Sequence, residues 1–318
     1  MFIPEKHGKG LRTMMESFFE DRPGEDESKE WSRGFMAPGG GRRFGSDERE
    51  LKRRKIRGAE ARAVALILRF PLLSKSCVRE VLGREEAETL SVLFHDGILG
   101  RFYEIDQSGN GDKKLTRVVY YASEAGRALF GRTIPGSSFP PSAIAEMTSL
   151  SKAELSGISE YAARACHGPA GGKLLSLDLP GREKPWMEAL IQKKGAFQPG
   201  ERVTRCLFHV IRRPLVRERV PAFLEMLYYI NERTLFEEGK EFRVKSWVVI
   251  LCESDDDMER FAAFLSRHVN SGHLPTGAAD RFLYALEEDA HDSGGAFKFL
   301  SRITFEAGTI KKSQVAFQ

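Results

Sequence analysis

The sequence predicts an α+β region over residues 57–132, followed by an α/β domain over residues 151–318. Three observations lead to this prediction. Apolar residues recur with helical spacing in three short segments between residues 59 and 95. Two strand-like segments joined by a glycine-rich turn follow them. Beyond residue 150, segments of strand and helix character alternate, which is typical of an α/β sheet.

Residues 1–56 are predicted to be a flexible basic arm, because glycine, proline and charged residues dominate them. Apolar residues over 11–19 fall at helical spacing and predict a short amphipathic helix. This helix would dock on the protein itself or on a partner subunit, or would lie on a membrane surface. A basic run that includes Arg53 and Arg54 then leads to residue 57, either as a solvated linker or as a phosphate-binding arm.

Three helices are predicted next. The first spans 59–69 and ends before Pro71, because a residue that precedes proline disfavours the helical conformation. The second begins after Ser74, a good capping residue, and the third spans 84–95. Gly97 closes the third helix, since glycine readily adopts the left-handed conformation. The expected core positions are Ala63, Val64, Ile67, Leu68, Cys77, Val78, Val81, Leu82, Leu90, Leu93 and Phe94.

A β-hairpin follows the helices. Its first strand is expected over 98–105, and its second strand over 115–120. The loop between them, 107–114, contains Gly-Asn-Gly, and a fourth helix begins at Ser123. Three helices and a hairpin in this order predict a winged helix-turn-helix, so the expected fold is an α+β winged helix-turn-helix followed by an α/β domain with a mixed sheet.

In such a fold the third helix enters the major groove of DNA. We expect Arg84 to read guanine and Glu88 to accept a hydrogen bond from cytosine, with Thr89 facing outward beside them. Glu85, Glu86 and Glu88 together would repel phosphates. A helix that binds protein, or that is only structural, therefore stays open as an alternative.

The hairpin carries basic residues that favour nucleic acid over protein. Lys113, Lys114 and Arg117 would contact the phosphate backbone, as a basic wing does. The formal net charge of the whole chain is only +4, so binding to DNA would depend on where these charges are placed.

Residues 133–150 are predicted to be a linker rich in proline and serine, and residues 151–318 the second domain. Asp255, Asp256 and Asp257 follow a strand that is apolar on both faces; they would bind Mg²⁺ or, more simply, begin a helix. The expected helices of this domain are 151–166, 186–194, 215–236 and 255–268, and the expected strands are 173–179, 203–211 and 244–252.

The chain resembles the replication-relaxation family of plasmids and integrated mobile elements over three segments, Leu66–Ser74, Leu93–Arg101 and Tyr120–Leu129. The resemblance implies a winged helix followed by a degenerate α/β domain of the restriction-nuclease type. The strand Phe208–Arg213 carries no carboxylate where such a nuclease would hold its metal. The resemblance therefore favours a binding protein over an enzyme.

We expect a DNA-binding protein that acts in replication, transfer or transcriptional control of a mobile element. A nuclease-related enzyme and a protein-interaction scaffold are the alternatives. The sequence predicts no catalytic residue, no cofactor and no metal site, because its four cysteines and seven histidines lack ligand spacing. Double-stranded DNA is the expected partner, with a second copy of the chain or a replication or transfer protein as further partners. No segment predicts a membrane span or a signal peptide, so a cytoplasmic location is expected.

Overall fold

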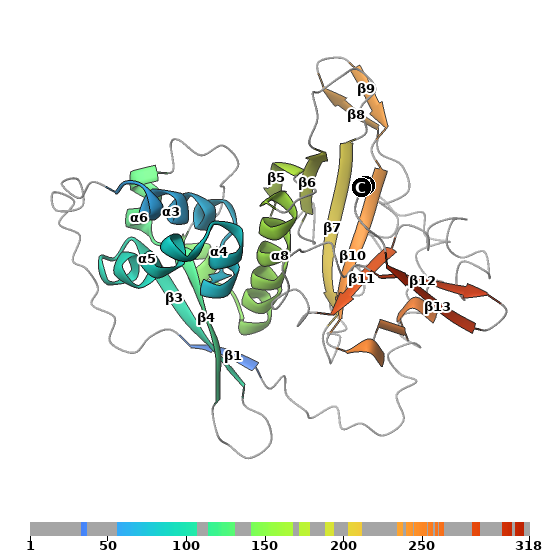
Figure 1. Ribbon diagram of the computed structural model, residues 1–318, viewed down its shortest axis with the longest axis horizontal. Helices are drawn as coiled ribbons and strands as arrows, with labels where there is room; N and C mark the ends of the chain where they lie inside the picture. The colour runs from blue at the N-terminus through green and yellow to red at the C-terminus, as the bar shows by residue number, and fades with distance from the viewer. Residues whose placement is uncertain are drawn as a thin grey trace. The chain divides into compact units, whose positions relative to one another are not determined.

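The computed structural model divides into two compact units, one spanning Trp31–Gly168 and the other containing residues 169–318, and each unit has its own main sheet (Figure 1). The residues that it describes are 33–36, 56–106, 114–130, 141–167, 172–178, 188–193, 203–211, 234–237, 240–243, 245–252, 254–256, 258–259, 261–263, 282–286, 301–306 and 309–314.

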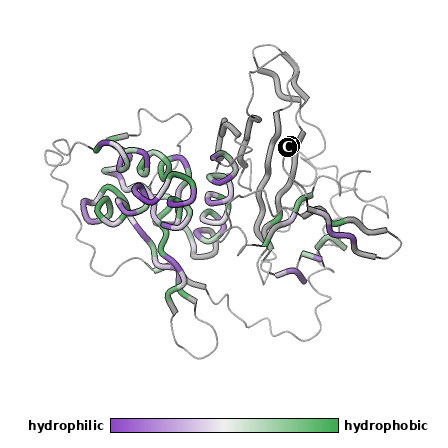
Figure 2. The backbone as a smooth tube through the Cα atoms, in the orientation of Figure 1, coloured by the Kyte–Doolittle hydropathy of each residue, from purple (hydrophilic) through white to green (hydrophobic). Residues whose placement is uncertain are grey.

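The three predicted helices are confirmed as α3 (Ala59–Arg69), α4 (Lys75–Val81) and α5 (Arg84–His95). Figure 2 shows hydrophobic and hydrophilic residues sharing each of these helices, as expected for helices with one buried face. The Ser74 hydroxyl accepts the Cys77 amide at 3.2 Å, so the predicted cap of α4 is present. Gly97 has φ 71°, the left-handed conformation that closes α5.

An antiparallel sheet packs against these helices. Strands β2 (Leu73–Ser74), β3 (Leu99–Asp106) and β4 (Lys114–Ala122) pair antiparallel in the order β3-β4-β2. A further strand, β1 (Arg33–Met36), pairs antiparallel with the outer edge of β3. This strand lies inside the arm that was expected to be flexible, and the expectation was wrong for these four residues because the edge of β3 offers them backbone hydrogen bonds.

Helix α6 (Glu124–Phe130) begins where the fourth helix was predicted. The Ser123 hydroxyl accepts the Gly126 amide at 3.1 Å and donates to the Ile98 carbonyl at 2.8 Å. A Cβ atom at Gly126 would lie 2.3 Å from the same carbonyl oxygen. Glycine is therefore required at this position, because α6 approaches the end of the α5–β3 turn too closely for any side chain.

Helices α7 (Pro141–Glu146) and α8 (Ser149–His167) complete the first unit. Residues 133–150 were expected to be a linker, and the helix after them was expected to open the second domain. The structure differs, since α8 packs against α4, β1 and β2. Apolar spacing identifies a helix but not its packing partner, which here is the first unit rather than the second.

The second unit contains a seven-stranded sheet in the order β13-β12-β11-β10-β7-β6-β5. Neighbouring strands are parallel between β7, β10 and β11 and antiparallel elsewhere. A separate hairpin joins β8 (Thr234–Glu237) to β9 (Lys240–Arg243). The strands of the large sheet are β5 (Gly172–Asp178), β6 (Glu188–Lys193), β7 (Val203–Ile211), β10 (Lys245–Cys252), β11 (Phe282–Leu286), β12 (Ser301–Glu306) and β13 (Thr309–Gln314).

One helix prediction in this unit was wrong, and a second conflicts with the structure in its last three residues, since 215–233 lie outside the described residues. The segment expected as a helix near 186–194 contains strand β6, which pairs with β5 on one side and β7 on the other. The end of the helix expected over 215–236 falls in β8. Pairing with neighbouring strands overrides the local preference of such short apolar segments. None of the helices that the structure describes is long and apolar enough to span a bilayer.

Candidate nucleic-acid interface

Helix α5 has one buried and one exposed face. Ala87, Leu90 and Leu93 are buried, and α3 and α4 both pack against this helix. The N-terminus of α5 follows Gly83, whose φ of 130° allows the sharp turn from α4. The exposed face presents charged, polar and apolar side chains to solvent: Arg84, Glu85, Glu88, Ser91, Val92 and His95.

Arg84 and Glu88 bind each other on this face. The Arg84 Nε donates to Glu88 Oε1 at 2.7 Å, and the two side chains are 83% and 53% exposed. The hydrogen bond from Arg84 lowers the pKa of Glu88, and the same bond raises the pKa of Arg84. Because the bond uses Nε, the two terminal nitrogens of the guanidinium remain to bind a second acceptor.

Glu86 does not belong to the exposed face. Its side chain is buried against α3, where Arg62 Nη2 lies 2.6 Å from Glu86 Oε1, and this hydrogen-bonded partner lowers the pKa of Glu86. The expectation that Glu85, Glu86 and Glu88 together repel phosphates was wrong in this respect. Since Glu88 is also paired, Glu85 is the acidic side chain of the three for which no ion pair is described.

Thr89 lies at the edge of the same face and is half-buried. Its hydroxyl donates to the backbone carbonyl of Glu86 at 2.7 Å, a local bond within the helix. The oxygen lone pairs of this hydroxyl can still accept a hydrogen bond from a ligand. Thr89 can therefore contribute an acceptor, while its proton is held by the helix.

Helix α4 adds two cations that the sequence prediction missed. Lys75 and Arg79 are exposed on α4, which packs against α5, and the charges of both help to lower the pKa of Glu88. Their four-residue spacing after the capping residue Ser74 was the signal that could have identified them, because it puts both on one side of the helix. The exposed faces of α4 and α5 together form the candidate interface, defined by Lys75, Arg79, Arg84, Glu88 and Thr89.

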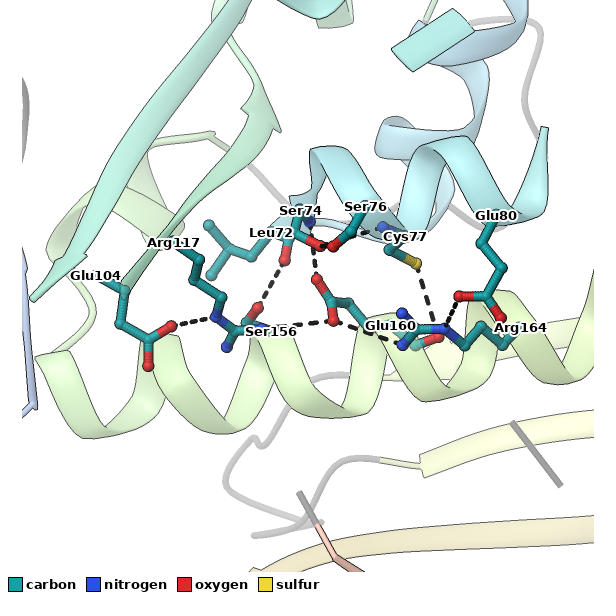
Figure 3. A network of polar contacts seen from close by, with 10 residues as sticks. All are labelled: Leu72, Ser74, Ser76, Cys77, Glu80, Glu104, Arg117, Ser156, Glu160 and Arg164. Atoms are coloured by element: carbon teal, nitrogen blue, oxygen red, sulfur yellow. Dashed lines mark hydrogen bonds and ion pairs between the residues drawn. The ribbon is translucent and has the colours of Figure 1, made fainter. Parts of the chain in front are cut away.

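Of the other predicted DNA-binding residues, Arg117 is the one whose side chain the structure describes. Arg53, Arg54 and Lys113 are outside the described residues, and Lys114 begins β4, where only its backbone is described. Arg117 was expected to contact phosphates from the hairpin. The structure turns it inward instead: its side chain is 16% exposed and pairs with Glu104 of β3 and with Glu160 of α8 (Figure 3).

The acidic residues after β10 are the other candidate site. Asp255 and Asp256 are exposed, and Asp255 Oδ1 lies 2.7 Å from Lys312 Nζ on β13. The Met258 amide donates to the Ser254 carbonyl at 3.1 Å, which is consistent with the helix start expected there. Within the described part of the chain, no group of three metal-binding side chains comes together.

Comparison of the chain with family models, curated proteins and solved structures finds no match. The structure explains two glycines at the α5–β3 turn and in β3. Gly97 has the left-handed conformation noted above, and a Cβ at Gly100 would lie 2.3 Å from the Tyr121 ring. Backbone conformation therefore explains Gly97, and the cross-strand packing of Tyr121 on β4 explains Gly100.

Proposed function

We propose that the first unit is a winged helix-turn-helix that binds duplex DNA through α4, α5 and the β3–β4 hairpin. The observation that carries the proposal is the exposed face of α5, which is flanked by the cations of α4. The order α3-β2-α4-α5-β3-β4, with β2 paired to β4, supports it, because this is the arrangement of winged helix-turn-helix domains.

The proposal gives each residue of the interface a role. Helix α5 lies in the major groove, where the terminal nitrogens of Arg84 bind the O6 and N7 atoms of guanine. Glu88 holds the guanidinium through Nε, in place of the direct cytosine contact expected from the sequence. Lys75 and Arg79 bind phosphates and set the register of the helix on the duplex.

The basic run before residue 56 and the two lysines of the hairpin, Lys113 and Lys114, extend the phosphate contacts. Arg53 and Arg54 belong to this run and would track the backbone beside the domain. Arg117 takes no part in this role, because its guanidinium is committed to two carboxylates.

We further propose that the protein serves replication, transfer or transcriptional control of a mobile element, as the resemblance to the replication-relaxation family implies. The second unit would then be a degenerate nuclease-like domain without catalysis. Its parallel strands β7 and β10 support this proposal, since β7 carries His209 opposite Ile250 and no carboxylate along its length.

A protein-binding helix is the second candidate function, and one observation favours it. Val92 on the outer face of α5 is 50% exposed, and a large apolar side chain in that position suits a protein partner. The two functions differ in how they respond to salt, because only DNA binding releases counterions from phosphates.

The test is a titration of the full chain with a fluorescent duplex at several salt concentrations. With about six to eight phosphates neutralised, the log–log slope of the binding constant against salt should be roughly −5 to −7. An affinity that does not change with salt would contradict the electrostatic part of the proposal.

Variants of α5 then separate the two functions. Arg84→Ala should weaken binding and relax the preference at one base pair, whereas Glu88→Gln should raise non-specific affinity while lowering that preference. If binding falls only in the double variant Lys113→Ala, Lys114→Ala, then α5 does not read the DNA.

A further inference from the structure

A largely buried cluster of charged and polar residues joins three parts of the first unit (Figure 3). It brings residues of α4, of the β3–β4 hairpin and of α8 into contact through hydrogen bonds and ion pairs. Its members are Ser74, Glu80, Glu104, Arg117, Glu160 and Arg164. Glu160 lies at its centre and is fully buried.

The first contact of Glu160 is with the start of α4. Its Oε1 accepts the backbone amide of Ser74 at 2.8 Å. One turn earlier on α8, the Ser156 hydroxyl donates to the Leu72 carbonyl at 2.8 Å. Leu72 has φ 63°, a left-handed conformation that costs energy for a residue with a Cβ atom and that persists only where its surroundings hold it. Helix α8 therefore fixes the chain as it enters α4.

The second contact is with the hairpin. Glu160 Oε2 lies 3.4 Å from Arg117 Nη1 on β4, and the Nε of the same arginine binds Glu104 on the neighbouring strand β3. Arg117 thus ties both strands of the hairpin to α8. The carboxylate of Glu160 therefore contacts the hairpin through Oε2 and the start of α4 through Oε1.

The third contact keeps the charge of Glu160 compensated. Arg164, one turn further along α8, lies 3.5 Å from Glu160 Oε2 and binds Glu80 of α4 at 2.7 Å through its Nε. Removing three carboxylates and two guanidinium groups wholly or partly from water is costly, and apolar residues of similar size often give equal or greater stability. A buried ionic cluster is therefore better explained by the orientation that it imposes than by the stability that it adds.

We propose that Glu160 is a positioning residue of the DNA-binding site, which holds the β3–β4 hairpin and α4 in one fixed orientation. The inference rests on the proposed function, in which α4 with α5 and the hairpin contact the same duplex. A binding surface made of two elements needs both held in one relative position. If one element is displaced, the two can no longer contact the duplex at the same time.

The test compares three single variants in the full chain. Glu160→Gln keeps the size of the side chain and an oxygen that can accept the Ser74 amide, but removes the charge that Arg117 and Arg164 face. Arg117→Gln removes the hairpin partner. Ser156→Ala is the matched control, because it loses one bond to the entry of α4 and none to the hairpin.

Hydrogen exchange of the backbone amides, measured without DNA, is the first readout. Glu160→Gln should speed exchange in both 73–81 and 99–122, while α3 keeps its protection. Ser156→Ala should affect only the segment around Leu72. Faster exchange confined to α8 in the Glu160→Gln variant would overturn the proposal.

Affinity for a duplex is the second readout, measured well below the unfolding temperature of each variant. We expect Glu160→Gln and Arg117→Gln each to lower affinity roughly tenfold, and the double variant to lose little more than either single one. Glu160→Asp, which keeps the charge, should restore part of the loss. If the losses of binding free energy in the two single variants add up to the loss in the double variant, the two residues act independently and the proposal is refuted.

The two readouts separate this inference from the proposed function. If the wild-type chain fails to bind any duplex but the exchange pattern appears as expected, the proposed function fails and the coupling of α4 to the hairpin stands. If Glu160→Gln does not fold, Arg117→Gln carries the test, since the Arg117 side chain is 16% exposed whereas that of Glu160 is fully buried. Exchange confined to β4 in that variant would then overturn the proposal.

Discussion

The two cations of α4 give the sharpest quantitative prediction. Lys75 and Arg79 are exposed on α4, which packs against α5, and no ion pair is described for either in this part of the structure. If α5 lies in the major groove, both side chains reach phosphates of the flanking backbone. The double variant Lys75→Ala, Arg79→Ala should then lose two phosphate contacts without disturbing the core.

The size of the loss follows from counterion release. Each phosphate neutralised contributes about 0.9 to the log–log slope, so the double variant should show a slope less negative by about 1.8. At 0.1 M salt this corresponds to about sixtyfold weaker binding, and the difference should shrink as salt rises toward 1 M. The free energy of unfolding should change little, because both side chains lie on the surface.

Fluorescence anisotropy of a labelled duplex across a series of salt concentrations measures both quantities. The double variant Lys311→Ala, Lys312→Ala is the control for net charge, since it removes the same charge from two exposed positions of β13, of which Lys312 pairs with Asp255. Equal slopes for the wild type and the α4 variant would show that α4 does not face the phosphates. Equal losses of affinity in the two double variants would show that binding depends only on the net charge of the protein.

Three further predictions test the packing and the second unit. Gly126→Ala should lower the free energy of unfolding by about 1–3 kcal/mol in chemical denaturation, because its Cβ would meet the Ile98 carbonyl at 2.3 Å; an unchanged midpoint would contradict this close approach. The hydrogen bond from Arg62 lowers the folded pKa of Glu86, so the contribution of this pair to stability is present above the ordinary glutamate pKa and is lost as pH falls through the folded pKa. In the variant Arg62→Gln, the free energy of unfolding should fall less steeply as the pH is lowered through this range. A fall as steep as that of the wild type would argue against the pair. Plasmid DNA should stay intact with Mg²⁺ or Mn²⁺, and cleavage that Asp255→Ala abolishes would restore the nuclease hypothesis.

The helices and hairpin of the first unit were predictable from the sequence because local signals set their limits. Residues 59–69 and 84–95 were assigned as helices from apolar spacing, and the structure gives the same limits. Ser74 as a cap and Gly97 as a stop are equally local, since each acts on backbone groups within three or four residues.

Strand partners and helix orientation were beyond such signals. Strand β1 lies in a segment of arm-like composition and exists through pairing with β3, and the segment 188–193 is a strand between two others. Both depend on residues far along the chain, so no window of neighbouring residues records them.

The candidate site was predictable in part for the same reason. Helical periodicity placed Arg84 and Glu88 on the exposed face of α5, and four-residue spacing could have revealed their pairing. Whether a charge faces solvent or another charge depended on the tertiary structure. Arg117 looked like a phosphate contact and Glu86 like a repulsive surface charge, yet each is paired with residues more than ten positions away. The sequence by itself determined the helical faces through local periodicity; only packing decided which charges those faces keep exposed, because burying a charge requires a partner that the fold brings from elsewhere.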